Sequence, residues 1–79
     1  MENHHPHVRL DPILGHVVRG TKLPVRRLFF WHQRGIAFEQ LRARYPKLNP
    51  AQILDALSFA HDCPEEIAQE VAQDRRRGR

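Results

Sequence analysis

The sequence lacks most of the features that cross-link or anchor a small protein. Its single cysteine, Cys63, cannot close an internal disulfide, and no Cys/His spacing is typical of a structural zinc site. No apolar run approaches the roughly 20 residues needed to cross a bilayer, and the N-terminus lacks the charged-then-apolar order of a signal peptide. We therefore expect a reduced, cytoplasmic protein without a metal, a cofactor or a membrane anchor.

Groups that could support catalysis are also scarce. The single serine, Ser58, and the cysteine have no base placed near them by sequence, and Glu65 and Glu66 fit the first turn of a helix better than an acid/base pair. His32 and His61 fall on or near apolar stripes and are expected to be packed. The other histidines lie in an arm without fixed geometry, where metal binding would be adventitious: His4, His5, His7 and His16. We do not expect an enzyme.

Basic charge is what the chain does have. Thirteen Lys and Arg residues against nine Asp and Glu residues give a formal net charge of +4 and a sequence pI near 10.2. This balance favours a polyanion or an acidic protein surface as partner, with an ordinary solvated surface as the alternative. A chain of 79 residues buries only roughly 60% of its unfolded surface, so we expect a partner to add to its stability.

Helix and turn signals divide the chain into short elements. Residues 1–7 have no apolar period and are expected to form a disordered arm, whereas the alternating and β-branched positions of residues 8–23 predict a β arm or small hairpin. Prolines at helix starts, Gly35 and a capping box at Asn49 then predict four helices: residues 24–34, 37–45, 50–62 and 64–74. The prediction is an all-α domain of three to four short helices over residues 8–74, with a basic tail over residues 75–79.

Apolar positions assign a core-facing side to the third helix. Ile53, Leu54, Leu57 and either Ala60 or His61 are expected to face the core. The positions expected to point outward are Ala51, Gln52, Asp55, Ala56 and Ser58.

Large aromatic residues lie off the apolar stripe of the first helix. Phe30 and Trp31 are adjacent there, and Phe59 lies off the stripe of the third helix. Surplus aromatics of this kind are typical of interfaces, so we expect a homodimer or a docked partner. Ordinary packing beneath the N-terminal arm is the alternative.

The second helix, the turn at residues 46–49 and the third helix have the lengths of a helix-turn-helix. One objection is that the outward positions of the third helix contain no Arg or Lys, leaving Gln52 and Ser58 as its only good base-reading side chains. Basic residues elsewhere could contact phosphates, or simply form a solvated face. The candidates chosen for DNA contact are Arg19, Lys22, Arg42, Arg44 and Lys47, and other cations that could meet phosphates are Arg9, Arg26, Arg27 and Arg34.

Two motifs carry a resemblance to a known family. The run Arg19-Gly20-Thr21-Lys22-Leu23-Pro24-Val25 and the later pair Tyr45-Pro46 have the order and spacing of the bacterial family catalogued as domain of unknown function 433, and the likeness covers about residues 8–68. The chain departs from the family pattern by being one residue shorter before Arg19 and by having lysine at position 22. The lysine loses the bidentate fork of an arginine.

The resemblance implies a fold and a function. Members of the family resemble VapB-type antitoxins, with a homeodomain-like helix-turn-helix behind a short β arm, and are commonly paired with a PIN-like ribonuclease toxin. It therefore implies an antitoxin of a type II toxin–antitoxin system that neutralises its toxin and binds its own promoter DNA. The alternatives are a stand-alone helix-turn-helix DNA-binding transcriptional regulator without a toxin, and a protein-interaction adaptor.

The basic tail suggests how such a toxin could be inhibited. Its arginines could pair with the metal-binding carboxylates of a PIN-like ribonuclease and displace the metal, with Ile67 and Val71 as a docking stem. The arginines in question are Arg75, Arg76, Arg77 and Arg79. A tail that only adds solubility or attracts nucleic acid is the alternative.

Overall fold

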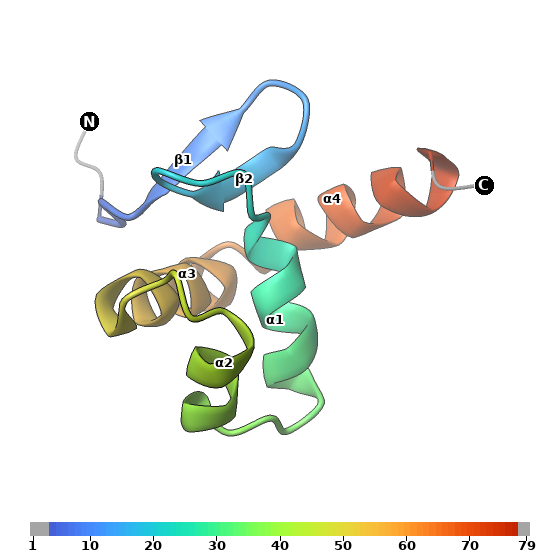
Figure 1. Ribbon diagram of the computed structural model, residues 1–79. Coiled ribbons are helices and arrows are strands. Elements are labelled where there is room, and N and C mark those ends of the chain that lie inside the picture. Colours follow the sequence, from blue (N-terminus) through green and yellow to red (C-terminus); the bar gives the residue numbers. More distant parts are fainter. Residues whose placement is uncertain (1–3, 78–79) are drawn as a thin grey trace.

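The computed structural model describes residues 4–77 and shows a mostly helical fold with a two-stranded antiparallel sheet at its N-terminal end (Figure 1). This confirms the predicted helical domain with a β arm. In chain order, the elements in the described part are β1 (Val8–Asp11), β2 (Gly15–Val18), α1 (Val25–Gln33), α2 (Phe38–Arg44), α3 (Pro50–Asp62) and α4 (Pro64–Arg77). The hairpin packs on α1 and α3 and α2 packs on the same two helices, while α4 projects from the body (Figure 1).

The β1–β2 hairpin is held by its strand register and by an aspartate at its turn. Val8 pairs with Val18 and Asp11 with Gly15. Asp11 Oδ1 accepts hydrogen bonds from the backbone N–H groups of Leu14 (2.9 Å) and Ile13 (2.8 Å), which fold the turn back on itself. These two bonds, with help from Lys22, lower the pKa of Asp11 to about 2 from its usual 3.8.

The start of α3 is fixed by the predicted capping box. Asn49 Oδ1 accepts a hydrogen bond from Gln52 N, and Gln52 Oε1 accepts one from Asn49 N, both at 2.8 Å. Pro50 occupies the first helical position, where its missing N–H costs nothing. The bounds of α3, Pro50–Asp62, are those predicted from these residues.

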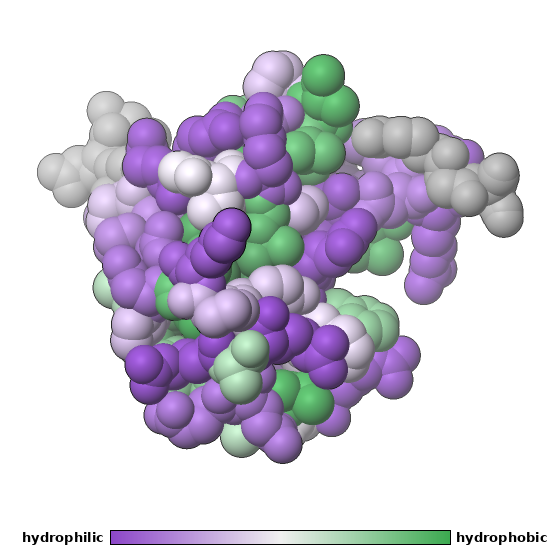
Figure 2. Space-filling model, in the orientation of Figure 1, coloured by the Kyte–Doolittle hydropathy of each residue, from purple (hydrophilic) through white to green (hydrophobic). Residues whose placement is uncertain are grey.

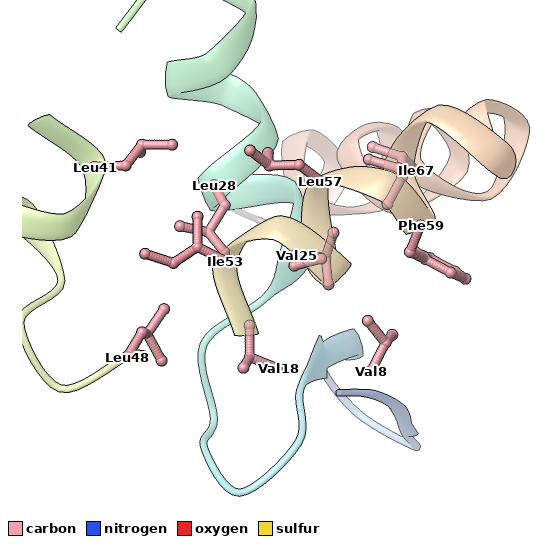
Figure 3. Packing of buried hydrophobic residues seen from close by; sticks show 12 residues of the cluster. Val8, Val18, Val25, Leu28, Leu41, Leu48, Ile53, Leu57, Phe59 and Ile67 are labelled. Carbon is pink, nitrogen blue, oxygen red and sulfur yellow. The ribbon is translucent and has the colours of Figure 1, made fainter. Parts of the chain in front are cut away.

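The core lies where α1, α2, α3 and the hairpin meet (Figure 3). On α3 the buried stripe is Ile53, Ala56, Leu57 and Ala60, with the i, i+3, i+4, i+7 spacing of a helix face. The prediction for two positions is therefore wrong: Leu54 is 55% exposed, and Ala56 is fully buried. The two alternative stripes differ by about one residue of rotation, and the small Ala56 gave no apolar signal strong enough to choose between them.

Three further expectations are corrected by the packing. Phe59 is buried against the rings of His5 and His16 and leaves no interface surface. The arm expected to be disordered has a defined position over residues 4–7, since His7 N donates to Asp55 and His5 contacts α3; residues 1–3 lie outside the described residues. α4 continues to Arg77, so most of the expected tail is helical.

None of the helices in the described residues is both long and apolar enough to cross a membrane.

Substitutions at two adjacent residues test the orientation of α3. Ile53→Ala removes a fully buried side chain and is expected to lower the free energy of unfolding by about 2–5 kcal/mol. Leu54→Ala removes an exposed side chain and is expected to change it by less than about 0.5 kcal/mol. Urea denaturation of both variants is the measurement, and equal losses would show that the helix faces the core differently.

Candidate functional site

A buried arginine determines where α4 lies. Arg26, on α1, donates from Nε and Nη2 to the carboxylate of Asp74 on α4, and from Nη1 to the carbonyl oxygen of Leu14 in the hairpin turn at 2.7 Å. Its Nη1 also lies 3.8 Å from Glu70 Oε1. A guanidinium bound in this way is not available to phosphate, so the prediction that Arg26 could meet DNA is wrong.

A second contact fixes α4 to the hairpin. Glu70 Oε2 accepts a hydrogen bond from His16 N at 3.2 Å and lies 2.6 Å from His16 Nδ1. The Glu70 carboxylate occupies the place where a Cβ at Gly15 would be, with its Cδ 2.6 Å from that position, and Gly15 has a φ of +84°. The positive φ favours glycine at position 15, and a side chain there would also displace the Glu70 carboxylate from its contact with His16.

An apolar groove runs between α1 and α4, and we call it the α1–α4 groove. It consists of two hollows of about 580 and 470 Å³ that share Arg26, Phe30 and Val71. The first hollow also includes Trp31, Tyr45 and Arg44, and the second Phe29, Ala68 and Ala72. Figure 2 shows the hollow beneath the projecting α4, with apolar surface on both of its sides. Phe30, between the two hollows, is 45% exposed.

Arginines stack on the aromatic rings of this groove. The Arg34 guanidinium lies 4.3 Å from the Phe30 ring centroid, and that of Arg44 lies 4.0 Å from the Trp31 ring centroid. The two aromatic rings meet edge to face at 5.1 Å. Each cation–π contact holds a positive charge at the edge of apolar surface. Arg44, predicted to contact DNA, therefore lies with Phe30 and Trp31, the residues predicted to contact a partner.

Part of this groove was visible in the sequence but was not recognised. Arg27, Phe30, Trp31 and Arg34 have the spacing i, i+3, i+4 and i+7, which puts them on one face of α1. The first three of these line the groove, and Arg34 covers Phe30. Considered separately, the aromatics and the arginines did not identify Arg27 and Arg34 as partner-contact candidates.

The other predicted DNA-contact residues divide into two groups. Arg19, Gln52 and Lys47 lie near the N-terminus of α3: Gln52 Nε2 donates to the Arg19 carbonyl oxygen at 3.4 Å, and Lys47 is exposed two residues before Asn49. Lys22 and Arg42 form ion pairs elsewhere, with Asp11 at 3.5 Å and Glu39 at 3.2 Å. Ser58 is exposed further along α3.

The predicted docking stem and tail both lie on α4. Ile67 is only 4% exposed and packs mainly in the protein's own core, although it also lines the second hollow, and Val71 lines both hollows. Arg75 and Arg76 are exposed near the end of α4, and Arg75 lines the second hollow. Arg77 ends α4, and Arg79 lies outside the described residues.

Cys63, His32 and His61 are the side chains near the ends of α1 and α3 that could carry chemistry. Burial raises the pKa of the Cys63 thiol, and the neighbouring Glu66 raises it further, so the thiol stays protonated near neutral pH and is a weak nucleophile. His32 and His61 contact each other through Nε2 at 3.1 Å, one ring donating to the other, and both pack on Phe29. Among the described residues, no group of three or more His, Cys, Asp or Glu side chains is arranged to hold a metal ion.

Comparisons with known proteins identify the family. Residues 15–60 match the family described as "Protein of unknown function (DUF433)". The chain belongs to this family. It is also similar to the crystal structure of a DUF433 member protein from Anabaena variabilis, with a TM-score of 0.73 and 29% sequence identity over 84% of this chain and 68% of that one. A comparison with curated proteins gave no match.

The family match covers one wall of the groove. It spans β2, α1, α2 and α3 but ends before α4 begins at Pro64. In this DUF433 protein the α1–α4 groove therefore joins residues of the family region, such as Phe30 and Trp31, to residues outside it, such as Val71 and Asp74.

His5 connects the N-terminal segment to α3 through two carboxylates. Its Nδ1 lies 2.9 Å from Asp55 and its Nε2 lies 2.8 Å from Asp62. Burial alone would lower the pKa of His5, but the bonds to Asp55 and Asp62 outweigh it and raise the pKa above 6.5. Both ring nitrogens can donate at once only in the imidazolium form.

The contribution of His5 to stability is expected to depend on pH. A group whose pKa is raised by folding stabilises the protein fully below its unfolded pKa, here 6.5, and loses this effect as the pH rises through the higher folded pKa. His5→Ala should therefore lower the free energy of unfolding by about 1–2 kcal/mol at low pH and by less at alkaline pH. Urea denaturation across this range is the measurement, with His4→Ala, at the exposed neighbouring residue, as control. A difference that grows with pH would contradict the assignment.

Proposed function

We propose that this DUF433 protein is an antitoxin of a type II toxin–antitoxin system, which neutralises a PIN-like ribonuclease toxin and binds its own promoter DNA. The Arg19–Val25 and Tyr45-Pro46 motifs resemble the DUF433 family, and the likeness of its members to VapB-type antitoxins suggests the function. The observation that carries the proposal is the open α1–α4 groove with its half-exposed Phe30. Apolar surface left open on so small a domain is typical of a protein that works in a complex.

The DNA-binding part of the proposal uses α2 and α3 as a helix-turn-helix. The N-terminus of α3 lies beside Arg19 and Lys47, and a helix N-terminus flanked by cations attracts phosphate. The exposed face of α3 would supply base contacts, with Ser58 as a hydrogen-bonding group and Leu54 as an apolar contact for thymine methyl groups. A homodimer would present two such helices to successive major grooves.

The position of Asp55 bears on DNA binding by α3. An acidic side chain on the outward face of this helix, where Asp55 was expected, would repel phosphates. The Asp55 carboxylate is instead turned to the N-terminal segment, where it accepts from His7 N at 2.7 Å and contacts His5. The exposed face of α3 is therefore close to neutral near its N-terminus, and the cations beside it determine the local potential.

DNA binding is tested by its salt dependence. Removing two phosphate contacts with a double substitution, Arg19→Ala and Lys47→Ala, is expected to weaken binding to the promoter. It should also reduce the slope of log affinity against log salt by about 2, since each phosphate contact releases roughly 0.9 counterions. Fluorescence anisotropy with labelled promoter DNA over a salt series is the measurement. The matched control is the Arg27→Ala variant, in the α1–α4 groove. An unchanged slope in the double variant would contradict the assignment.

Toxin neutralisation is tested by co-expression with the adjacent reading frame. If that frame encodes a PIN-like ribonuclease, the two proteins are expected to purify as a complex, and expression of this chain is expected to restore growth. DNA binding without a complex or rescue would favour a stand-alone transcriptional regulator. Neither binding nor rescue would leave a protein-interaction adaptor.

A further inference from the structure

We propose that the α1–α4 groove is the toxin-binding site and that its occupant is an acidic amphipathic helix of the toxin. This inference rests on the proposed function and specifies the surface and the chemistry of the interaction. Toxin binding is assigned here to a preformed groove instead of the flexible arginine tail expected from the sequence, since α4 is helical to Arg77 and is held in place by Arg26. A preformed site avoids the entropic cost of ordering a tail on binding.

The apolar floor of the groove requires an occupant with apolar side chains. Phe30 is exposed between two hollows, with Trp31 on one side and Ala68 and Ala72 on the other. An elongated groove with an aromatic ridge fits a helix that inserts anchors at i, i+3 or i+4, and i+7. α4 has 14 residues and a length of about 21 Å at 1.5 Å per residue, so a helix of several turns can lie along it.

The basic rim of the groove requires negative charge on the occupant. Four arginines border it or cover its aromatic rings: Arg27, Arg34, Arg44 and Arg75. Among the described residues, no carboxylate forms an ion pair with any of these four. The carboxylates nearest the groove are already bound, because Asp74 pairs with Arg26 and Glu70 with His16. Carboxylates on the occupant would therefore meet uncompensated cations.

Charge and apolar area together select this occupant over two others. A second copy of this chain has a net charge of +4 and would bring further cations to the same rim. A nucleic acid would satisfy the rim but would leave the apolar floor around Phe30 and Val71 unfilled, because protein–DNA interfaces are mainly polar. An acidic amphipathic helix satisfies both parts of the groove.

Two substitutions in the full chain test the site, and each has a matched control substitution in a helix outside the groove. Phe30→Ala and Arg44→Glu change the groove, while Leu54→Ala changes an exposed apolar residue on α3 and Arg42→Glu changes an arginine on α2 outside it. Affinity for the purified PIN-like toxin is measured by titration, affinity for promoter DNA by anisotropy, and oligomeric state by sedimentation.

The proposal predicts that Phe30→Ala weakens toxin binding about tenfold or more, while its DNA affinity and oligomeric state stay unchanged, and that Arg44→Glu weakens toxin binding about 100-fold. The Leu54→Ala and Arg42→Glu controls are expected to bind toxin as the wild type does. Wild-type toxin affinity in both groove variants would overturn the site but leave the antitoxin function standing. Loss of DNA binding alone, or of self-association alone, in the Phe30→Ala variant would assign the groove to nucleic acid or to a second copy. Failure of the wild-type chain to bind the toxin would overturn both proposals.

Discussion

The buried guanidinium of Arg26 is the interaction on which the arrangement of α1, α4 and the hairpin depends. It binds the Asp74 carboxylate of α4 and the Leu14 carbonyl of the hairpin turn, with Glu70 at 3.8 Å. Removing the Asp74 carboxylate while these elements stay packed would leave the buried guanidinium without its main partner, at a cost of about 3–5 kcal/mol. The groove follows from this constraint, because Ile67 and Val71 pack α4 against the core, and the polar contacts of Glu70 and Asp74 hold the helix at its angle to α1.

Local signals were sufficient to predict the elements but not how they meet. The Asn49 capping box, Pro50 and the positive-φ Gly35 act over a few residues, and the helix boundaries near them were predicted closely. The fixed position of residues 4–7 was not predictable, because the partners of His5 lie 50 and 57 residues away. The continuation of α4 to Arg77 reflects the good helix propensity of arginine, which the expectation of a flexible tail overlooked.

The surroundings of individual basic residues could not be predicted from the sequence pattern. Arg26 and Arg27 are adjacent, yet the first is buried in an ion pair and the second is exposed at the groove. Arg42 and Arg44, two residues apart on α2, lie respectively beside Glu39 and over Trp31. Helical rotation between such neighbours changes their surroundings completely, and only the position of the opposing element decides which one is paired. The wall formed by α4 could therefore not be inferred from the arginines themselves.

The same internal pairing makes the protein's surface more basic than its net charge indicates. Four acidic residues are engaged largely within the fold: Asp11, Asp55, Glu70 and Asp74. They bind backbone N–H groups, histidines and the buried Arg26 more than they offset exposed cations, apart from the Lys22 and Arg9 contacts of Asp11. Positive charge is therefore left uncompensated at the N-terminus of α3 and along the groove. The two surfaces differ in apolar content, because the N-terminus of α3 is polar whereas the groove contains Phe30 and Val71. The same excess of positive charge therefore suits a phosphate backbone at the N-terminus of α3 and an acidic amphipathic helix in the groove.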